Sequence, residues 1–312
     1  SPAIALAQPR AVEKCGLAVL RAAASGGLLL LLASGLAPAA GATARPTTIQ
    51  AGPAPALVYP VDVVVAGGTL VVADFKAHGL FRVAADGSVA AIVQGDGLPR
   101  TPLYGTRAVV QAPDGNGWLV ADPGTFGLYR VASDGTLSTI TTELDIPQGL
   151  AAFDGHSVLV SDLRSGIGAI MQVTLDGVVT VFAELGSPKG IVADGDDGFA
   201  VVSHGERALF HLSRDGHVST IAAGPPFDFP HDLVRLEDGS FVVTDGYASA
   251  LFRVSRDGKV APLAQGPPLV NPQGIALAPD GTLVVVDPQA GAIFRVTLEG
   301  KISTILQVHG NG

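Results

Sequence analysis

From residue 57 onward, short runs of apolar and β-branched residues alternate with turns that contain glycine. Four such runs form a unit, and the prolines that lead four consecutive units are 41, 42 and 42 residues apart, at Pro147, Pro188, Pro230 and Pro272. Helical repeats would instead show an apolar stripe with a period of about 3.6 residues. The pattern therefore predicts a chain of repeated units, each built from four short strands.

The clearest marker of the repeat is a strand with the pattern Leu/Ile-Phe/Tyr-Arg-Val, followed by a turn with Asp-Gly or Glu-Gly. Six copies occur, at 80–83, 128–131, 170–173, 209–212, 251–254 and 293–296, of which the third reads Ile-Met-Gln-Val and the fourth Leu-Phe-His-Leu. Glycine supplies the positive φ that tight hairpins require, so each unit is expected to be an antiparallel meander. A single meander cannot bury both of its faces, so neighbouring units stack around an axis. We therefore predict an all-β fold, a six-bladed β-propeller of four-stranded antiparallel blades, over residues 57–307.

The closure of the ring has two solutions in the sequence. The segment TTIQAGP at 47–53 matches the outer-strand segment STIAAGP at 219–225, which makes residues 45–56 a candidate closing strand. The last unit also has an outer strand of its own at 301–307, followed by a short tail at 308–312. The sequence predicts that one of the two segments pairs with the last blade.

The first 44 residues have the pattern of a secretory leader. Arg10, Lys14 and Arg21 precede the apolar run 26–36, and Ala42-Thr43-Ala44 has the A-x-A form that signal peptidase reads. The alternative is a membrane anchor, but a run of 11 residues is short of the roughly 20 that span a bilayer. We expect cleavage near Ala44, a secreted or periplasmic protein, and no membrane span afterwards.

Composition and charge narrow the classes of partner. The chain is 47% hydrophobic and 15% charged, with a formal net charge of −9, so neither nucleic acid nor an anionic membrane would be attracted to it on average. The only cysteine, Cys15, lies in the leader, which excludes disulfides and thiolate metal sites from the mature chain.

The motifs Pro-x-Gly-Ile-Ala, Asp-Gly, an apolar run ending in Val-Asp, and Ile-Phe-Arg-Val resemble the NHL-type repeat. The six-unit chain is similar, over about residues 47–307, to the superfamily that holds gluconolactonase-like proteins and virginiamycin B lyases. This scaffold hosts hydrolases, lyases and binding modules, so the resemblance implies a fold more than an activity. Gluconolactonase-like sites take metal ligands from Glu, Asn and Asp on inner strands, and the lyases pair His with Glu. The aligned inner positions here contain neither Glu nor Asn.

In a propeller the first strand of each blade lines the central channel, and ligands of related propellers bind at the rim where these strands begin. The first rim position of the six units reads Val61, Arg107, Gln148, Lys189, His231 and Gln273. Five of these residues are polar although the strands that follow are apolar. We expect Arg107, Gln148, Lys189 and Gln273 to contact a ligand, with Arg107 suited to a carboxylate or a phosphate.

The stretch DFPHDLV at 228–234 departs from its relatives, which read Gln-Gly or Lys-Gly where it has His231 and Asp232. Asp62 occupies the same place in the first unit. One interpretation is that both carboxylates accept hydrogen bonds from nearby backbone N–H groups. The other is a carboxylate pair, Asp62 and Asp232, that holds a divalent cation (Ca, Mg, Mn or Zn) or works as acid and base.

A second departure lies in the fourth unit. Five units end their second strand in Asp, at positions 74, 122, 162, 245 and 287, which we interpret as a repeated loop cap, whereas the fourth has Ser203-His204. Blades in sequence order would bring His204 close to His231, Lys189 and Asp232, with Tyr247 flanking this sector.

Two classes of function fit these patterns. The first is a secreted propeller that binds a small ligand or a partner protein at the channel rim. The alternative is a lactone hydrolase or lyase at the same rim, with His231, His204 and Asp232 as catalytic residues and with or without a divalent cation.

Overall fold

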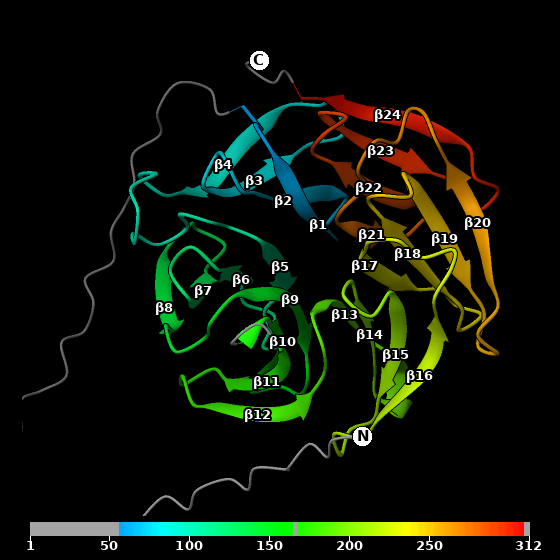
Figure 1. The fold of residues 1–312 in the computed structure, drawn as a ribbon. Coiled ribbons are helices and arrows are strands. Elements are labelled where there is room, and N and C mark those ends of the chain that lie inside the picture. Colours follow the sequence, from blue (N-terminus) through cyan, green and yellow to red (C-terminus); the bar gives the residue numbers. More distant parts are fainter. Residues whose placement is uncertain (1–55, 165–166, 309–312) are drawn as a thin grey trace, which may run out of the picture. The chain divides into compact units, whose positions relative to one another are not determined.

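The computed structural model describes residues 56–164 and 167–308. Six four-stranded antiparallel sheets surround a central channel (Figure 1). The predicted all-β, six-bladed propeller is thus confirmed. The leader 1–44, the segment 45–55 and residues 309–312 lie outside the described residues, so the expectations about them stay predictions.

Each blade takes its four strands from one continuous stretch of chain. The first blade contains β1 (Pro60–Ala66), β2 (Thr69–Asp74), β3 (Gly79–Val83) and β4 (Val89–Gln94). The second contains β5 (Ala108–Gln111), β6 (Trp118–Asp122), β7 (Gly127–Val131) and β8 (Leu137–Thr141). The third contains β9 (Pro147–Ala152), β10 (Ser157–Asp162), β11 (Ala169–Thr174) and β12 (Val179–Glu184). The fourth blade contains β13 (Pro188–Ala193), β14 (Phe199–Ser203), β15 (Ala208–Leu212) and β16 (Val218–Ala223). The fifth contains β17 (Pro230–Arg235), β18 (Phe241–Asp245), β19 (Ala250–Val254) and β20 (Val260–Gln265). The sixth contains β21 (Ile275–Leu277), β22 (Leu283–Asp287), β23 (Ala292–Val296) and β24 (Ile302–Gln307).

The last blade is completed by its own outer strand. β24 pairs antiparallel with β23 from Ala292↔Gln307 to Val296↔Ile302. Of the two predicted closures, residues 302–307 therefore supply the fourth strand of this sheet, while 47–53 lie outside the described residues. The ring closes by packing of the first blade against the sixth, in a cluster that includes Val63 and Val286.

The core lies between neighbouring blades because both faces of the middle strands are covered. The second strand of five blades is buried along its whole length, as in β10 and β18, whereas outer strands alternate between exposed and buried positions. Leu119 of the second blade packs in one cluster with Val160 and Met171 of the third. Continuous apolar runs in the middle strands are what such two-sided burial requires.

The predicted aspartate loop caps are present. Asp245 accepts hydrogen bonds from the backbone N–H groups of Asp228 and Phe229, both at 2.8 Å, and of Ala248 at 3.1 Å. It thereby ties the loop entering β17 to the loop after β18. In the fourth blade, Ser203 replaces this cap by donating to the carbonyl oxygen of Gly186 at 2.6 Å.

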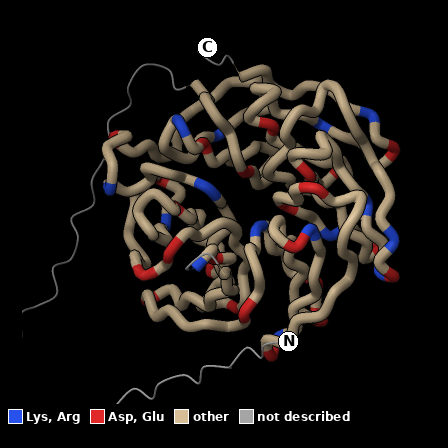
Figure 2. Tube along the Cα trace, in the orientation of Figure 1, with Lys and Arg blue, Asp and Glu red and all other residues tan. Residues whose placement is uncertain are grey.

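Charged residues are spread over the blades, with both signs at the outer edge (Figure 2). One buried carboxylate joins two blades on the side away from the caps. Asp194, 1% exposed, accepts from Arg235 Nε at 2.7 Å and from both terminal nitrogens of Arg256 at 2.6 and 2.7 Å. Arg235 and Arg256 belong to the fifth blade, so Asp194 links it to the fourth. No helix in the described part of the chain is long and apolar enough to cross a membrane.

Candidate functional site

The six inner strands β1, β5, β9, β13, β17 and β21 line a cavity of about 350 Å³ in the central channel. Seven of the nine residues that the sequence singled out lie on its wall, so the alignment of the repeats located the channel correctly. These residues are Asp62, Arg107, Gln148, Lys189, His231, Asp232 and Gln273. The other two, His204 and Tyr247, lie in loops beside it.

A ring of polar side chains surrounds the end of the cavity where the inner strands begin. Lys189 Nζ donates to Gln148 Oε1 at 2.6 Å, between adjacent blades. Arg107 Nη1 donates to Gln273 Oε1 at 2.9 Å, which links the second blade to the sixth. The four residues predicted to contact a ligand therefore form two pairs, each of one cationic side chain and one amide side chain.

Asp62 and Asp232 bind backbone of the next blade. Asp62 Oδ2 accepts from the N–H of Val109 at 2.8 Å, and its Oδ1 from the N–H of Val63 at 2.7 Å. Asp232 Oδ2 accepts from the N–H of Ile275 at 3.1 Å. Of the two interpretations made from the sequence, the structure contains the hydrogen bonds of the first, because each carboxylate joins two inner strands.

Glycine on the preceding blade makes room for each carboxylate. A Cβ added to Gly190 would lie 2.3 Å from Asp232 Oδ1 and 2.6 Å from Asp232 Cα. A Cβ on Gly274 would lie 2.5 Å from Asp62 Cα. Real Cβ atoms do not approach other atoms this closely, so the Gly-Asp pairing between blades follows from the narrowness of the channel.

Burial weakens the acidity of both carboxyl groups. Desolvation raises the pKa of Asp232 to about 6, and desolvation together with the charge of Asp232 raises the pKa of Asp62 well above its usual range. Among the described residues no group of three or more His, Cys, Asp or Glu side chains could hold a metal ion. Two acids with backbone partners, beside the positive charge of Arg107, are a poor fit to a divalent cation.

Lys189 is a buried amine without a carboxylate partner. Lys189 is 9% exposed. Neither Lys189 nor Arg107 forms an ion pair with any described residue. Desolvation, assisted by the charge of Arg107, lowers the pKa of Lys189 to about 7.

His231 lies under the loop after β18. A Cβ on Gly246 would meet Asn271 Oδ1 at 2.0 Å and His231 Nε2 at 2.9 Å, so this glycine leaves space for His231 to meet Asn271. His231 is 8% exposed, and its Nδ1 has no hydrogen-bond partner in the described protein. Burial lowers its pKa well below the usual value, and the charges of Arg107 and Lys189 act in the same direction, so the imidazole is neutral.

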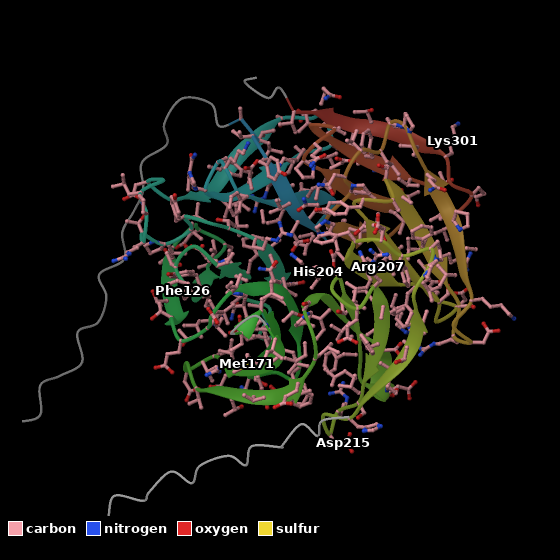
Figure 3. The ribbon with its side chains drawn as sticks, in the orientation of Figure 1. Phe126, Met171, His204, Arg207, Asp215 and Lys301 are labelled. Atoms are coloured by element: carbon pink, nitrogen blue, oxygen red, sulfur yellow. The ribbon has the colours of Figure 1, made fainter. Side chains whose placement is uncertain are left out.

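Phe229 is the residue around which the predicted sector assembles. Its ring lies 4.6 Å from that of His204, 5.0 Å from that of His231 and 4.5 Å from that of Tyr247, on which it stacks. His204 lies near the centre of the ring of blades, while Lys301 and Asp215 lie at its outer edge (Figure 3). The sequence predicted that His204 lies close to His231, Lys189 and Asp232, with Tyr247 flanking them. The ring contacts bring His204, His231 and Tyr247 together around Phe229, and Lys189 and Asp232 lie with His231 on the cavity wall.

Sequence reasoning missed two contributors to this sector, Phe229 and Asn271. Both lie immediately before the position that leads an inner-strand segment, where Tyr59, Gly105, Ile146 and Ser187 occupy the equivalent places in the other units. Comparing this column across the six units would have singled out the aromatic and amide side chains, because the position faces the rim in every blade.

Exposed apolar side chains gather on the same side of the ring as the polar end of the cavity. We call this side the rim face: it carries the loops before the inner strands and the loops between second and third strands. Of the ten large exposed hydrophobic residues in the described part of the chain, eight lie in these loops, in every blade except the fourth. They are Val58, Phe75, Leu98, Phe126, Ile146, Ile167, Tyr247 and Val270.

Comparison with known proteins finds likeness in structure alone. No protein-family model matches the chain, and no curated protein matches it. Among solved structures, a virginiamycin B lyase from Staphylococcus aureus matches with a TM-score of 0.63 and 18% identity, covering 79% of this chain and 84% of that one. The likeness is one of fold.

Two further structures show how widely this fold is used. A gluconolactonase from Xanthomonas campestris matches with a TM-score of 0.60 and 17% identity, covering 75% of this chain and 84% of that one. A chain of a nidogen/laminin complex matches with a TM-score of 0.60 and 14% identity, covering 77% and 88%. The protein is a six-bladed propeller with lyase, gluconolactonase and nidogen-type neighbours, and its function has to be argued from its own site.

Proposed function

We propose that this protein binds a small molecule at the rim-face end of its central cavity. The observation that carries the proposal is a pair of buried ring nitrogens around that end that have no hydrogen-bond partner among the described residues: His231 Nδ1 and His204 Nδ1. A buried polar group left without a hydrogen bond costs about 1–3 kcal/mol. A ligand that hydrogen-bonds to these atoms removes that penalty.

The size and lining of the cavity favour a small molecule over a protein partner. Its volume of about 350 Å³ is at the lower end of the range of roughly 300–1,000 Å³ typical of small-molecule pockets. Its wall combines apolar strand residues with a few convergent polar groups, and Phe229 and Tyr247 supply aromatic surface beside it. These are the usual components of a ligand site.

Ligand titration with a matched pair of variants tests the proposal. A library of small aromatic and heterocyclic compounds would be screened by thermal shift, and the compounds that bind would be measured by calorimetry. Phe229→Ala is expected to weaken binding, whereas Phe126→Ala, an exposed residue of the second blade on the same face, should leave it unchanged. Equal binding by both variants would place the ligand elsewhere and contradict the proposal.

A second candidate is hydrolysis or elimination on a lactone or ester at the same site. The specific observation in its favour is His231, a neutral imidazole on the cavity wall that is able to accept a proton. One structural neighbour is a virginiamycin B lyase that a His-to-Ala change renders catalytically inactive. Turnover would be measured on a panel of lactones and aryl esters with His231→Ala, His204→Ala and Asp232→Ala. Turnover that survives His231→Ala would eliminate this candidate.

Export is part of the proposal and rests on the leader-like pattern of residues 1–44. Cleavage after Ala44 would give a mature chain that begins at Arg45 and is found in the medium or the periplasm. N-terminal sequencing of the protein recovered from each fraction tests this, and an intact residue 1–44 segment on all recovered protein would contradict it.

A further inference from the structure

Two cationic side chains at the rim-face end of the cavity have no anionic partner. Lys189 Nζ donates to Gln148 Oε1 alone, and Arg107 donates to Gln273 Oε1 through one of its terminal nitrogens. Three N–H groups on an ammonium and five on a guanidinium exceed what these two amides accept. Among the described residues, both cations thus have donors left for a ligand, and neither contacts a carboxylate.

The nearby carboxylates are occupied with the backbone. The oxygens of Asp62 accept the N–H groups of Val63 and Val109, and Asp232 accepts that of Ile275. The positive charges of Arg107 and Lys189 also reach both histidines, since each contributes to lowering the pKa of His231 and His204. The charges of Asp62 and Asp232 act on Arg107, whereas the only charge that shifts the pKa of Lys189 is that of Arg107. Lys189 and Arg107 therefore place positive charge beside the two histidines, which favours an anion there.

Aromatic surface adjoins this sector. β13, which carries Lys189, packs beside β17, and the loop leading into β17 carries Phe229. The face-to-face pair of Phe229 and Tyr247, with ring centroids 4.5 Å apart, extends from the buried His231 and the half-buried His204 to a tyrosine side chain that is 68% exposed. A flat apolar group is the natural partner of such a surface.

We infer that the ligand is a small organic oxyanion with an apolar, preferably aromatic, body. Its anionic group binds between Lys189 Nζ and the Arg107 guanidinium, and its body lies against Phe229 and Tyr247. A charge-assisted bond to a guanidinium or ammonium in a desolvated site is about twice as strong as a neutral hydrogen bond, so the head group sets selectivity. This inference rests on the proposed small-molecule site and adds the chemical class of what it holds.

Two fluorescent probes that differ only in charge test the class of ligand. Anilinonaphthalene sulfonate is an aromatic oxyanion, and phenylnaphthylamine is the same aromatic body without the sulfonate. The wild-type protein is expected to bind the sulfonate about ten-fold more tightly, or better, and Lys189→Gln is expected to abolish that preference while leaving the neutral probe unchanged. Lys76→Gln, an exposed lysine on the same rim face, is the matched control and should alter neither affinity.

The outcomes distinguish failure of the anion class from failure of the small-molecule site. Equal affinities of the two probes for the wild-type protein, both lost in Phe229→Ala, would overturn the anion class and leave the small-molecule site standing. Binding of neither probe would count against both. Arg107→Gln provides a second, independent removal of charge if Lys189→Gln does not fold, and a sulfonate affinity that survives both changes would overturn the inference.

Discussion

The carboxylate of Asp232 on β17 accepts a hydrogen bond from the backbone N–H of Ile275 on β21, 3.1 Å away, and so joins the fifth blade to the sixth. His231, the neighbouring residue in the chain, instead lies on the cavity wall with an unpartnered Nδ1. The two residues that distinguish the stretch DFPHDLV therefore have different tasks. Asp232 holds the blades together, while His231 faces the cavity.

The Asp232 contact makes stability depend on pH in a defined direction. Burial raises the pKa of Asp232 to about 6, above the value of about 3.9 in an unfolded chain. The contribution of Asp232 to the free energy of unfolding is then fully present below about pH 4 and is lost as the pH rises through about 6. Asp232→Asn, which does not titrate, should destabilise most near pH 4 and less near pH 8 in urea denaturation. A destabilisation that is constant over this range would contradict the assignment.

Gly190→Ala tests how closely the blades approach each other. The new methyl group would lie 2.6 Å from Asp232 Cα, which is backbone and cannot move aside cheaply. Overpacking of this kind costs about 1–3 kcal/mol in unfolding free energy. Gly155→Ala is the matched control, because nothing lies within 4 Å of its added Cβ. Similar melting temperatures for the two variants would show that the channel is wider than described.

Replacing Lys189 by methionine should stabilise the protein at neutral pH. Burial lowers the pKa of Lys189 to about 7, below the value of about 10.4 in an unfolded chain, so stability is lost as the pH falls from about 10 towards 7. Lys189→Met removes this penalty and should gain on the order of 2 kcal/mol near pH 7, with the gain vanishing near pH 10. Chemical denaturation at both pH values measures it, with exposed Lys76→Met as the control. If Lys189→Met were less stable than wild type at pH 7, burial of the Lys189 amine without a carboxylate partner would not be the cost that we infer.

The affinity for the sulfonate probe should fall as the pH rises. Lys189 loses its proton around its pKa of about 7, whereas Arg107 remains charged and His231 and His204 are already neutral. Ionisation of Asp232 through about 6 adds negative charge in the same direction. We expect a decrease of about ten-fold between pH 6.5 and 9 in wild type, and in Lys189→Gln a shallower decrease that comes from the carboxyl groups alone. Parallel profiles would assign the dependence to another group.

The contact of Asp194 with Arg235 and Arg256 predicts a large effect of one substitution far from the cavity. Asp194→Asn removes the negative charge that pairs with both arginines. Because the arginine side chains are 33% and 41% exposed, we expect the free energy of unfolding to fall by about 2 kcal/mol, less than for a fully buried pair. Asp238→Asn breaks an exposed ion pair with Arg253 and should change the melting temperature little. Ligand binding should be unaffected in both variants.

Much of the candidate site could be predicted from the sequence because the repeat supplies its own alignment. Arg107, Lys189, His231 and Gln273 were identified as polar residues at one repeated position before apolar strands, and the structure places all four on one cavity. Phe229 was missed because its position precedes the proline that was used to align the units. Asn271 was missed for the same reason, and both matter through contacts with other blades or loops.

The sequence by itself determined the number of blades, the strand order and the aspartate caps, because these depend on local patterns of apolar runs, turn glycines and loop-closing hydrogen bonds. Only the tertiary structure decided which carboxylates join blades and which cations stay unpaired. The bonds from Ile275 to Asp232 and from Val109 to Asp62 connect residues 43 and 47 positions apart. Such contacts depend on how closely neighbouring inner strands approach the axis, and that distance is set by the packing of whole blades.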